Sequence, residues 1–166
     1  MNILALDYGT KTGYCFGSDL SNMVCGTWTL ATPREVTEWG KTRRTRTCDP
    51  RMARLATYLR QFPLANTVVF EDVQFASSTY QVQLWASLRA VAWLDYPETT
   101  RFECVPVATL KKFATGSGVA TKERMWQALV AAGHAKPASG MLWDDNTVDA
   151  IWIWLWARQT FSRSST

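Results

Sequence analysis

The chain has 166 residues, of which 47% are hydrophobic and 19% charged, and its formal net charge is +4. This balance predicts one globular domain over residues 1–166 and excludes an intrinsically disordered chain. No apolar run approaches the roughly 20 residues that a membrane-spanning helix needs, so we expect no membrane partner.

Two short apolar runs begin the chain and flank the glycine turn from Gly9 to Gly13. They indicate a strand at 3–7, a tight turn and a second strand at 13–16. Further strands are predicted at 23–30, at 67–70 with Glu71 and Asp72 at its end, and at 102–107.

Helices are predicted where apolar residues recur at helical spacing, first after the capping pair Asp49-Pro50 and up to Phe62. The others are expected at 81–94, 107–114, 121–132 and 146–161. This order predicts an α/β fold in which helices flank a mixed five-stranded sheet whose first strands are antiparallel.

The four cysteines and the single histidine show no metal-ligand spacing. Cys15, Cys25 and Cys104 lie in strand-like apolar contexts, which predicts buried thiols. His134 alone cannot build a zinc site or a catalytic triad, and an exposed loop position is expected for it. Because no secretory segment precedes the first strand, we expect a reduced, cytoplasmic setting.

A basic segment follows the third predicted strand and carries four cations in six residues, namely Lys41, Arg43, Arg44 and Arg46. It lacks apolar periodicity, which is typical of a loop. Two interpretations remain open, a solvated basic loop or a loop that contacts the phosphates of a nucleic acid.

Acidic residues end two of the predicted strands. Asp7 ends the first strand and Glu71 the central one, and ligands of α/β sheets bind at the carboxyl ends of strands. A carboxylate buried there is costly without a cation, so Asp7 predicts either a divalent metal or a phosphate group that brings its own metal.

The last predicted helix is almost wholly apolar but carries acids at its beginning. Asp145 and Asp149 are four residues apart and share a face with Asn146. A capping role is plausible for Asp144 or Asp145, whereas Asp149 lies in the second turn and needs a nearby cation. Carboxylates from three distant segments are what a two-Mg²⁺ site for phosphodiester cleavage requires.

Four motifs together resemble the RuvC-type Holliday junction resolvases of the ribonuclease H-like superfamily. They occur in the family's order over nearly the whole chain, at 3–13, 68–71, 110–122 and 145–150. The resemblance implies a single RuvC-like nuclease domain that resolves four-way DNA junctions by paired nicks. It further implies a homodimer with two Mg²⁺ or Mn²⁺ ions per site and no organic cofactor, and the compact, tryptophan-rich chain resembles a phage version acting in the host cytoplasm.

The resemblance also implies roles for the acids. Asp7 would bridge the two metal ions, Glu71 would hold one of them, and Asp149 would be the carboxylate on the last helix. The family usually places a second ligand three residues before that aspartate, where this chain has Asn146. Asp145 and Asn146 are therefore alternatives for the fourth ligand, and we favour Asp145.

Residues that approach DNA are implied in the same way. Lys111 and Lys122 match family lysines near the scissile phosphate, and the expected helix N-terminus at Lys122 suits an anion. Phe75 is the candidate for the aromatic residue that stacks at the opened junction, although it lies one position later than usual. Trp85 and Trp93 belong either to the core or to a dimer interface, since the family dimerises near that helix.

Other protein classes share parts of this pattern. An actin-like kinase needs two lobes and a second phosphate loop, for which the chain is too short. A YqgF-like RNA nuclease shares the opening motif, but the glutamate strand and the Gly116-Ser-Gly118 segment before Lys122 favour RuvC. A debranching nuclease with looser specificity for branched DNA remains an alternative interpretation. The intact acids argue against a non-catalytic junction-binding protein.

Overall fold

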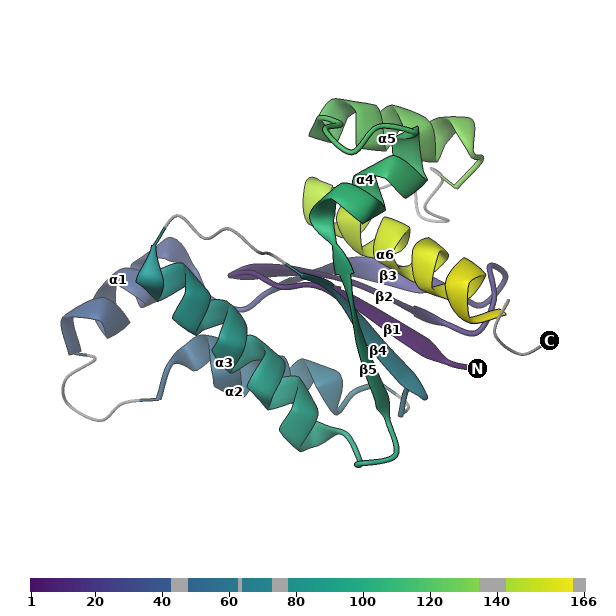
Figure 1. Ribbon diagram of the computed structural model, residues 1–166. Helices are drawn as coiled ribbons and strands as arrows, with labels where there is room; N and C mark the ends of the chain where they lie inside the picture. Colours follow the sequence, from purple (N-terminus) through teal and green to yellow (C-terminus); the bar gives the residue numbers. More distant parts are fainter. Residues whose placement is uncertain (43–47, 63, 73–77, 135–142, 163–166) are drawn as a thin grey trace.

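The structure is a computed structural model that describes residues 1–42, 48–62, 64–72, 78–134 and 143–162 (Figure 1). Its five-stranded sheet has the order β3-β2-β1-β4-β5. β1 pairs antiparallel with β2, as β2 does with β3, whereas β1–β4 and β4–β5 are parallel. The predicted mixed sheet is confirmed, with these bounds: β1 Ile3–Asp7, β2 Lys11–Gly17, β3 Val24–Thr29, β4 Thr67–Asp72 and β5 Arg101–Pro106.

Helices cover both faces of the sheet. Figure 1 shows α2 and α3 on one face, α6 across the other, and α4 and α5 beyond α6. The bounds are α1 Pro33–Thr42, α2 Pro50–Leu59, α3 Thr79–Asp95, α4 Val107–Thr115, α5 Lys122–Ala131 and α6 Asp145–Ser162. None of the helices in the described part of the chain combines the length and apolar character that crossing a membrane requires.

Strand alternation divides the interior into two apolar cores. On β1, Ile3 and Ala5 pack in the core beneath α6, whereas Leu4 and Leu6 pack in the core beneath α2 and α3. Since successive side chains of a strand point to opposite faces, Asp7 falls on the α6 face. Glu71 follows Val69 on the same face of β4 by the same alternation.

Helix α6 lies unusually close to β2. A Cβ atom at Gly13 would overlap the carbonyl group of Asn146, so only glycine allows this approach. Further along α6, the indole Nε1 of Trp154 donates to the carbonyl oxygen of Gly17 at 3.2 Å. The glycine at the end of the turn motif therefore lets the first turn of α6 reach the edge where β1 ends.

Helix α1 was not expected from the sequence. The structure places Lys41 in the last turn of α1, not in the predicted basic loop. Thr32 and Glu35 form a reciprocal capping box, in which the Thr32 N–H donates to Glu35 at 2.8 Å and the Glu35 N–H to Thr32 at 3.2 Å. The helix has no buried residue and contains only two large apolar residues, Val36 and Trp39, which are too few to form an apolar repeat.

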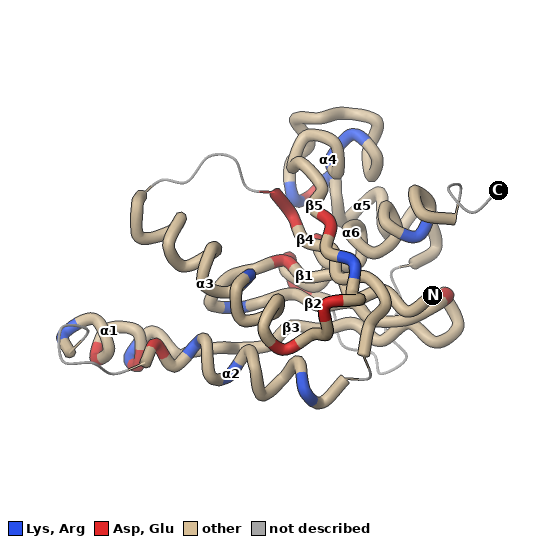
Figure 2. The backbone as a smooth tube through the Cα atoms, turned by 60° about the horizontal axis from the view of Figure 1, so that its bottom comes forward, with Lys and Arg blue, Asp and Glu red and all other residues tan. Residues whose placement is uncertain are grey.

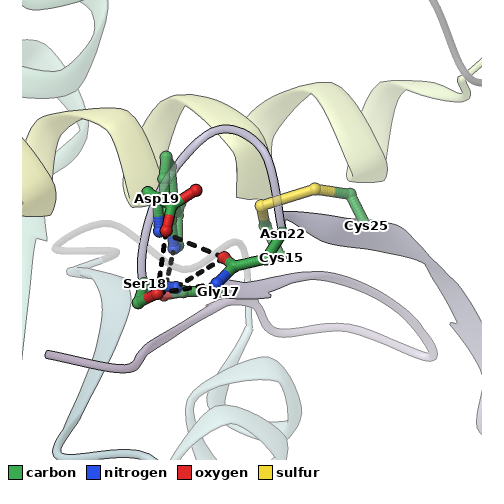
Figure 3. Close-up of a disulfide and its surroundings, with 7 residues drawn as sticks. Cys15, Gly17, Ser18, Asp19, Asn22 and Cys25 are labelled. Carbon is green, nitrogen blue, oxygen red and sulfur yellow. Dashed lines mark hydrogen bonds between the residues drawn. A yellow bond between two sulfur atoms is a disulfide. The ribbon is translucent and has the colours of Figure 1, made fainter.

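The cysteines also differ from expectation. Cys15 on β2 and Cys25 on β3 lie directly opposite each other, close to the turn between the two strands. They are joined in a disulfide, whereas the sequence predicted free thiols (Figure 3). Cys104 is exposed rather than buried. β5 is an edge strand, so its side chains are less covered than those of the central strands.

Candidate active site

Three acids from distant parts of the chain interact at the carboxyl ends of β1 and β4. Asp7 ends β1, Glu71 lies near the end of β4, and Asp149 occupies the second turn of α6. Burial raises the pKa of Asp7 well above its usual value, and the charges of Asp149 and Glu71 raise it further. The structure thus brings together Asp7, Glu71 and Asp149, and the charge of Asp145, the fourth predicted catalytic acid, also raises the pKa of Asp149.

Burial and nearby charges also shift the pKa values of Glu71 and Asp149. Burial, followed by the charge of Asp149, raises the pKa of Glu71 to about 7. Burial also raises the pKa of Asp149 to about 6, although the charges of Lys122 and Lys111 oppose the rise. Partly buried carboxylates that repel one another are stabilised by a cation, which makes this cluster a candidate metal site.

Both predicted lysines adjoin the acids. Lys111 on α4 lowers the pKa of Glu71, and Figure 2 shows blue positions of α4 near the red end of β4. Lys122, the first residue of α5, places its Nζ 3.3 Å from an oxygen of Asp145. Burial alone would lower the pKa of Lys122, but the charges of Asp149, Asp145 and Asp7 raise it. The site therefore holds fixed positive charge next to the carboxylates.

Asp144 rather than Asp145 has the capping contacts at the beginning of α6. Its carboxylate accepts hydrogen bonds from the Thr147 N–H at 3.0 Å and from the Thr27 hydroxyl at 2.5 Å. Burial raises the pKa of Asp144, but these hydrogen bonds outweigh it and hold the pKa below its usual value. Asp145 is left exposed in the first turn, where it pairs with Lys122.

The side chain of Asn146 is half-buried, and its Nδ2 lies 3.5 Å from a carboxylate oxygen of Asp144. The two candidates for a fourth ligand thus lie next to each other in the first turn of α6, Asp145 paired with Lys122 and Asn146 beside Asp144. Their shared first turn is held against Gly13 at the same edge as Asp7.

The donor chemistry of the cluster fits Mg²⁺ or Mn²⁺. Asp7, Glu71 and Asp149 offer carboxylate oxygens, the ligands that these ions prefer. Among the described residues, no three His, Cys, Asp or Glu side chains already stand at the spacing of a complete metal cage. Mg²⁺ does not need one, because it keeps several of its waters and binds through one or two carboxylates.

A small pocket of about 20 Å³ lies beside the acids and is large enough for a water molecule. Asp7 and Glu71 line it together with Tyr8, Trp85 and Arg89. Trp85 donates from Nε1 to the Tyr8 carbonyl oxygen at 3.2 Å, which holds α3 against the end of β1. Arg89 was not among the site residues predicted from the sequence. It could have been identified because it lies four residues after Trp85 and therefore on the same face of α3.

The remaining predicted DNA contacts are only partly described. Lys41 is exposed and pairs with Glu38 at 3.0 Å within α1. Arg43, Arg44, Arg46 and Phe75 lie outside the described residues. The isolated His134 is half-buried beyond the end of α5, on the rim of a shallow groove formed with α4 and α6.

Comparison with protein-family models gives no match, and comparison with curated protein sequences gives none either. Solved structures do match. The RuvC of T. thermophilus in complex with a Holliday junction substrate superposes with a TM-score of 0.64 at 17% identity, covering 96% of both chains.

Two further structures have similar folds. A second Thermus thermophilus RuvC structure matches with a TM-score of 0.54 and 18% identity, covering 96% of this chain and 97% of that one. The yeast mitochondrial Holliday junction resolvase Ydc2 matches with a TM-score of 0.52 and 11% identity, covering 97% of this chain and 80% of that one. The expected ribonuclease H-like, RuvC-type fold is thereby confirmed.

Proposed function

We propose that this chain is a metal-dependent endodeoxyribonuclease that resolves four-way DNA junctions by paired nicks. The observation that carries the proposal is the coupling of Asp7, Glu71 and Asp149 at one end of the sheet, with raised pKa values for all three. The likeness of the fold to that of a RuvC bound to a Holliday junction substrate supports branched DNA as the substrate.

In this proposal Asp7, Glu71 and Asp149 hold two Mg²⁺ or Mn²⁺ ions, with Asp145 or Asn146 as the fourth ligand. Such a pair of ions supplies an activated water and stabilises the leaving oxygen of the phosphodiester. Asp7 is the central ligand, since the charges of both Glu71 and Asp149 act on its carboxylate. The ends of β1 and β4 and the second turn of α6 keep the three carboxylates in fixed positions as the ions and DNA bind.

The lysines hold the DNA rather than the metal ions. Lys122 and Lys111 stand next to the carboxylates and carry the charge that attracts a phosphate group. Lys122 lies at the beginning of α5, where unpaired backbone N–H groups add to the attraction. When DNA enters, we expect Lys122 to exchange its exposed ion pair with Asp145 for the phosphate, leaving Asp145 free to bind metal.

Paired nicks need two sites, and a homodimer provides them. Helix α3 contains only two charged residues in 17, Arg89 and Asp95, yet exposes Val82, Trp93 and Leu94. Val82 and Trp93 fall on the same face of the helix, separated by eleven residues or about three turns. An exposed apolar helix face of this kind is typical of a protein interface, so we place the dimer contact there.

The proposal is tested by incubating the protein with labelled four-way junction, flap, duplex and RNA–DNA hybrid, with Mg²⁺, with Mn²⁺ and with EDTA. We expect symmetric paired nicks in the junction that require a metal ion. Preferred cleavage of flaps would instead favour the looser debranching nuclease, and cleavage of RNA or of the hybrid alone would favour a YqgF-like RNA nuclease. Junction binding without cleavage in any metal would identify a non-catalytic binding protein.

The variant Asp7→Asn removes the central carboxylate charge while keeping the size of the side chain. We expect it to bind the junction as the wild type does but to lose cleavage by about 100-fold or more, the usual scale for removing an essential catalytic group. Gel-shift and cleavage assays measure the two properties separately. Glu98→Gln, which removes an exposed acid from the turn before β5, is the control and should cleave normally.

A further inference from the structure

Arg51 is a buried arginine outside the acid cluster. It lies in the first turn of α2 and is only 2% exposed. Its Nε and Nη2 donate to the carboxylate of Asp49 at 2.9 and 2.6 Å, and Asp49 also caps α2 by accepting from the Arg51 N–H at 3.0 Å. This local ion pair compensates the buried charge but uses only part of the guanidinium's five donors.

The other donors reach two elements of the proposed site. Nη1 donates to the Thr10 hydroxyl at 3.2 Å, and Nη2 donates to the Tyr80 hydroxyl. The guanidinium also lies against the rings of Trp39 and Tyr80, 5.8 and 5.5 Å from their centroids. One side chain thus touches α1, the β1–β2 turn and the first turn of α3 from its place on α2.

These contacts lead directly to the acids. Thr10 lies three residues after Asp7, in the turn directly before β2, and Gly13 in β2 packs against α6. Tyr80 belongs to the beginning of α3, the helix that follows Glu71 and β4 in the chain. Arg51 therefore contacts both the turn that follows β1 and the first turn of the helix that follows β4 in the chain.

We propose that Arg51 is a positioning residue that fixes the turn after Asp7 relative to the beginning of α3, and so sets the geometry of the proposed nuclease site. The planar fork allows it to hydrogen-bond Asp49, Thr10 and Tyr80 together while stacking on two rings. A lysine keeps the charge but cannot reproduce that arrangement. The inference rests on the proposed function for its effect on cleavage, whereas the link between the turn and α3 stands independently of it.

The first test is amide hydrogen exchange on the metal-free protein, comparing Arg51→Lys with Arg60→Lys. Arg60 is the matched control because it also joins α2 to α3, through Asp95 at 2.7 Å, but follows the other end of α2. We expect Arg51→Lys to speed exchange by about tenfold in 9–13 and 79–84, as local opening does, and to leave β1 and β4 protected. The proposal would be overturned if Arg51→Lys exchanged its amides in both segments at the same rate as the wild type. It would also be overturned if Arg60→Lys showed the same increase as Arg51→Lys.

Two milder variants cover the case in which Arg51→Lys unfolds the chain. Tyr80→Phe and Thr10→Val each delete one hydroxyl that Arg51 contacts, and neither residue belongs to the buried core, since Tyr80 is exposed and Thr10 half-buried. Each should raise exchange in its own segment and, if Arg51 links them, in the other one as well. Independent effects confined to the mutated segment would contradict the link.

Cleavage supplies the second readout. For Arg51→Lys we expect kcat on a four-way junction to fall by about 10- to 100-fold, the cost of misplacing a reacting group by about 1 Å, with junction affinity unchanged. Loss of affinity with normal kcat would overturn the positioning role. If the wild-type chain cleaves no nucleic acid at all, the proposed function fails, and the exchange experiment still decides whether Arg51 holds the two segments together.

Discussion

At the end of β4, the Glu71 carboxylate is removed from water and faces the charge of Asp149, and its pKa rises to about 7. A folded-state pKa above the unfolded value means that the folded chain binds more protons than the unfolded one between roughly pH 4 and 7. Stability contributed by this group is therefore present at low pH and is lost as the pH rises through that window.

We accordingly expect Glu71→Gln to stabilise the metal-free protein at pH 8 by up to about 3 kcal/mol, using about 1.4 kcal/mol per pKa unit, and to change little at pH 4. Urea unfolding at the two pH values measures this. Mg²⁺ should stabilise the wild type more than Glu71→Gln at pH 8, since it binds the folded state through the removed carboxylate. A Glu71→Gln protein that is less stable than the wild type at pH 8 would contradict the like-charge interpretation.

At the scale of elements, the approach of α6 to β2 brings Asp149 to Asp7. The sequence could predict these elements because β1, β4 and α6 have strong apolar patterns, and the acids follow from their places at the strand ends. It could not predict that Asp144 rather than Asp145 has the capping contacts, because the deciding hydrogen bond comes from Thr27, over a hundred positions earlier.

Neither helix α1 nor the contacts of Arg51 could be predicted from the sequence, and the reasons are related. α1 contains only two large apolar residues, Val36 and Trp39, so it shows no apolar repeat, although the capping box of Thr32 and Glu35 was visible. The distant neighbours of Arg51 come from α1, the β1–β2 turn and α3, and they meet only when the chain is folded. Long-range contacts of this kind leave no periodicity in the sequence.

Gly13→Ala tests the approach of α6 to β2. The added methyl group would overlap the Asn146 carbonyl, so the first turn of α6 must shift, and we expect cleavage to fall by about 100-fold with a lower melting temperature. Junction cleavage and thermal unfolding measure the two effects. Gly40→Ala is the control, since a Cβ atom there meets nothing within 4 Å and alanine favours the helix. Normal cleavage by Gly13→Ala would show that α6 can move without disturbing the site.

At the scale of the whole molecule, the dimer contact that we propose on the exposed face of α3 would let two sites act together. We expect the wild type to sediment as a dimer and Trp93→Glu to sediment as a monomer, because the substitution buries an unpaired charge in the contact. Val130→Glu, an exposed apolar residue on α5, should leave the dimer intact. A monomeric wild type, or an unchanged dimer in Trp93→Glu, would remove α3 from the interface.

The positions of the acids along the chain determine when the site is completed during synthesis. Asp7 belongs to the first strand and Asp149 to the last helix, so a growing chain carries its first acid long before the last one. Because α6 packs against β1 to β4 on one face of the sheet, most of that face stays open to water until α6 has left the ribosome. A ribosome-bound intermediate should therefore display Asp7 and Glu71 while lacking the third carboxylate, and nuclease activity should arise only with the final folding step.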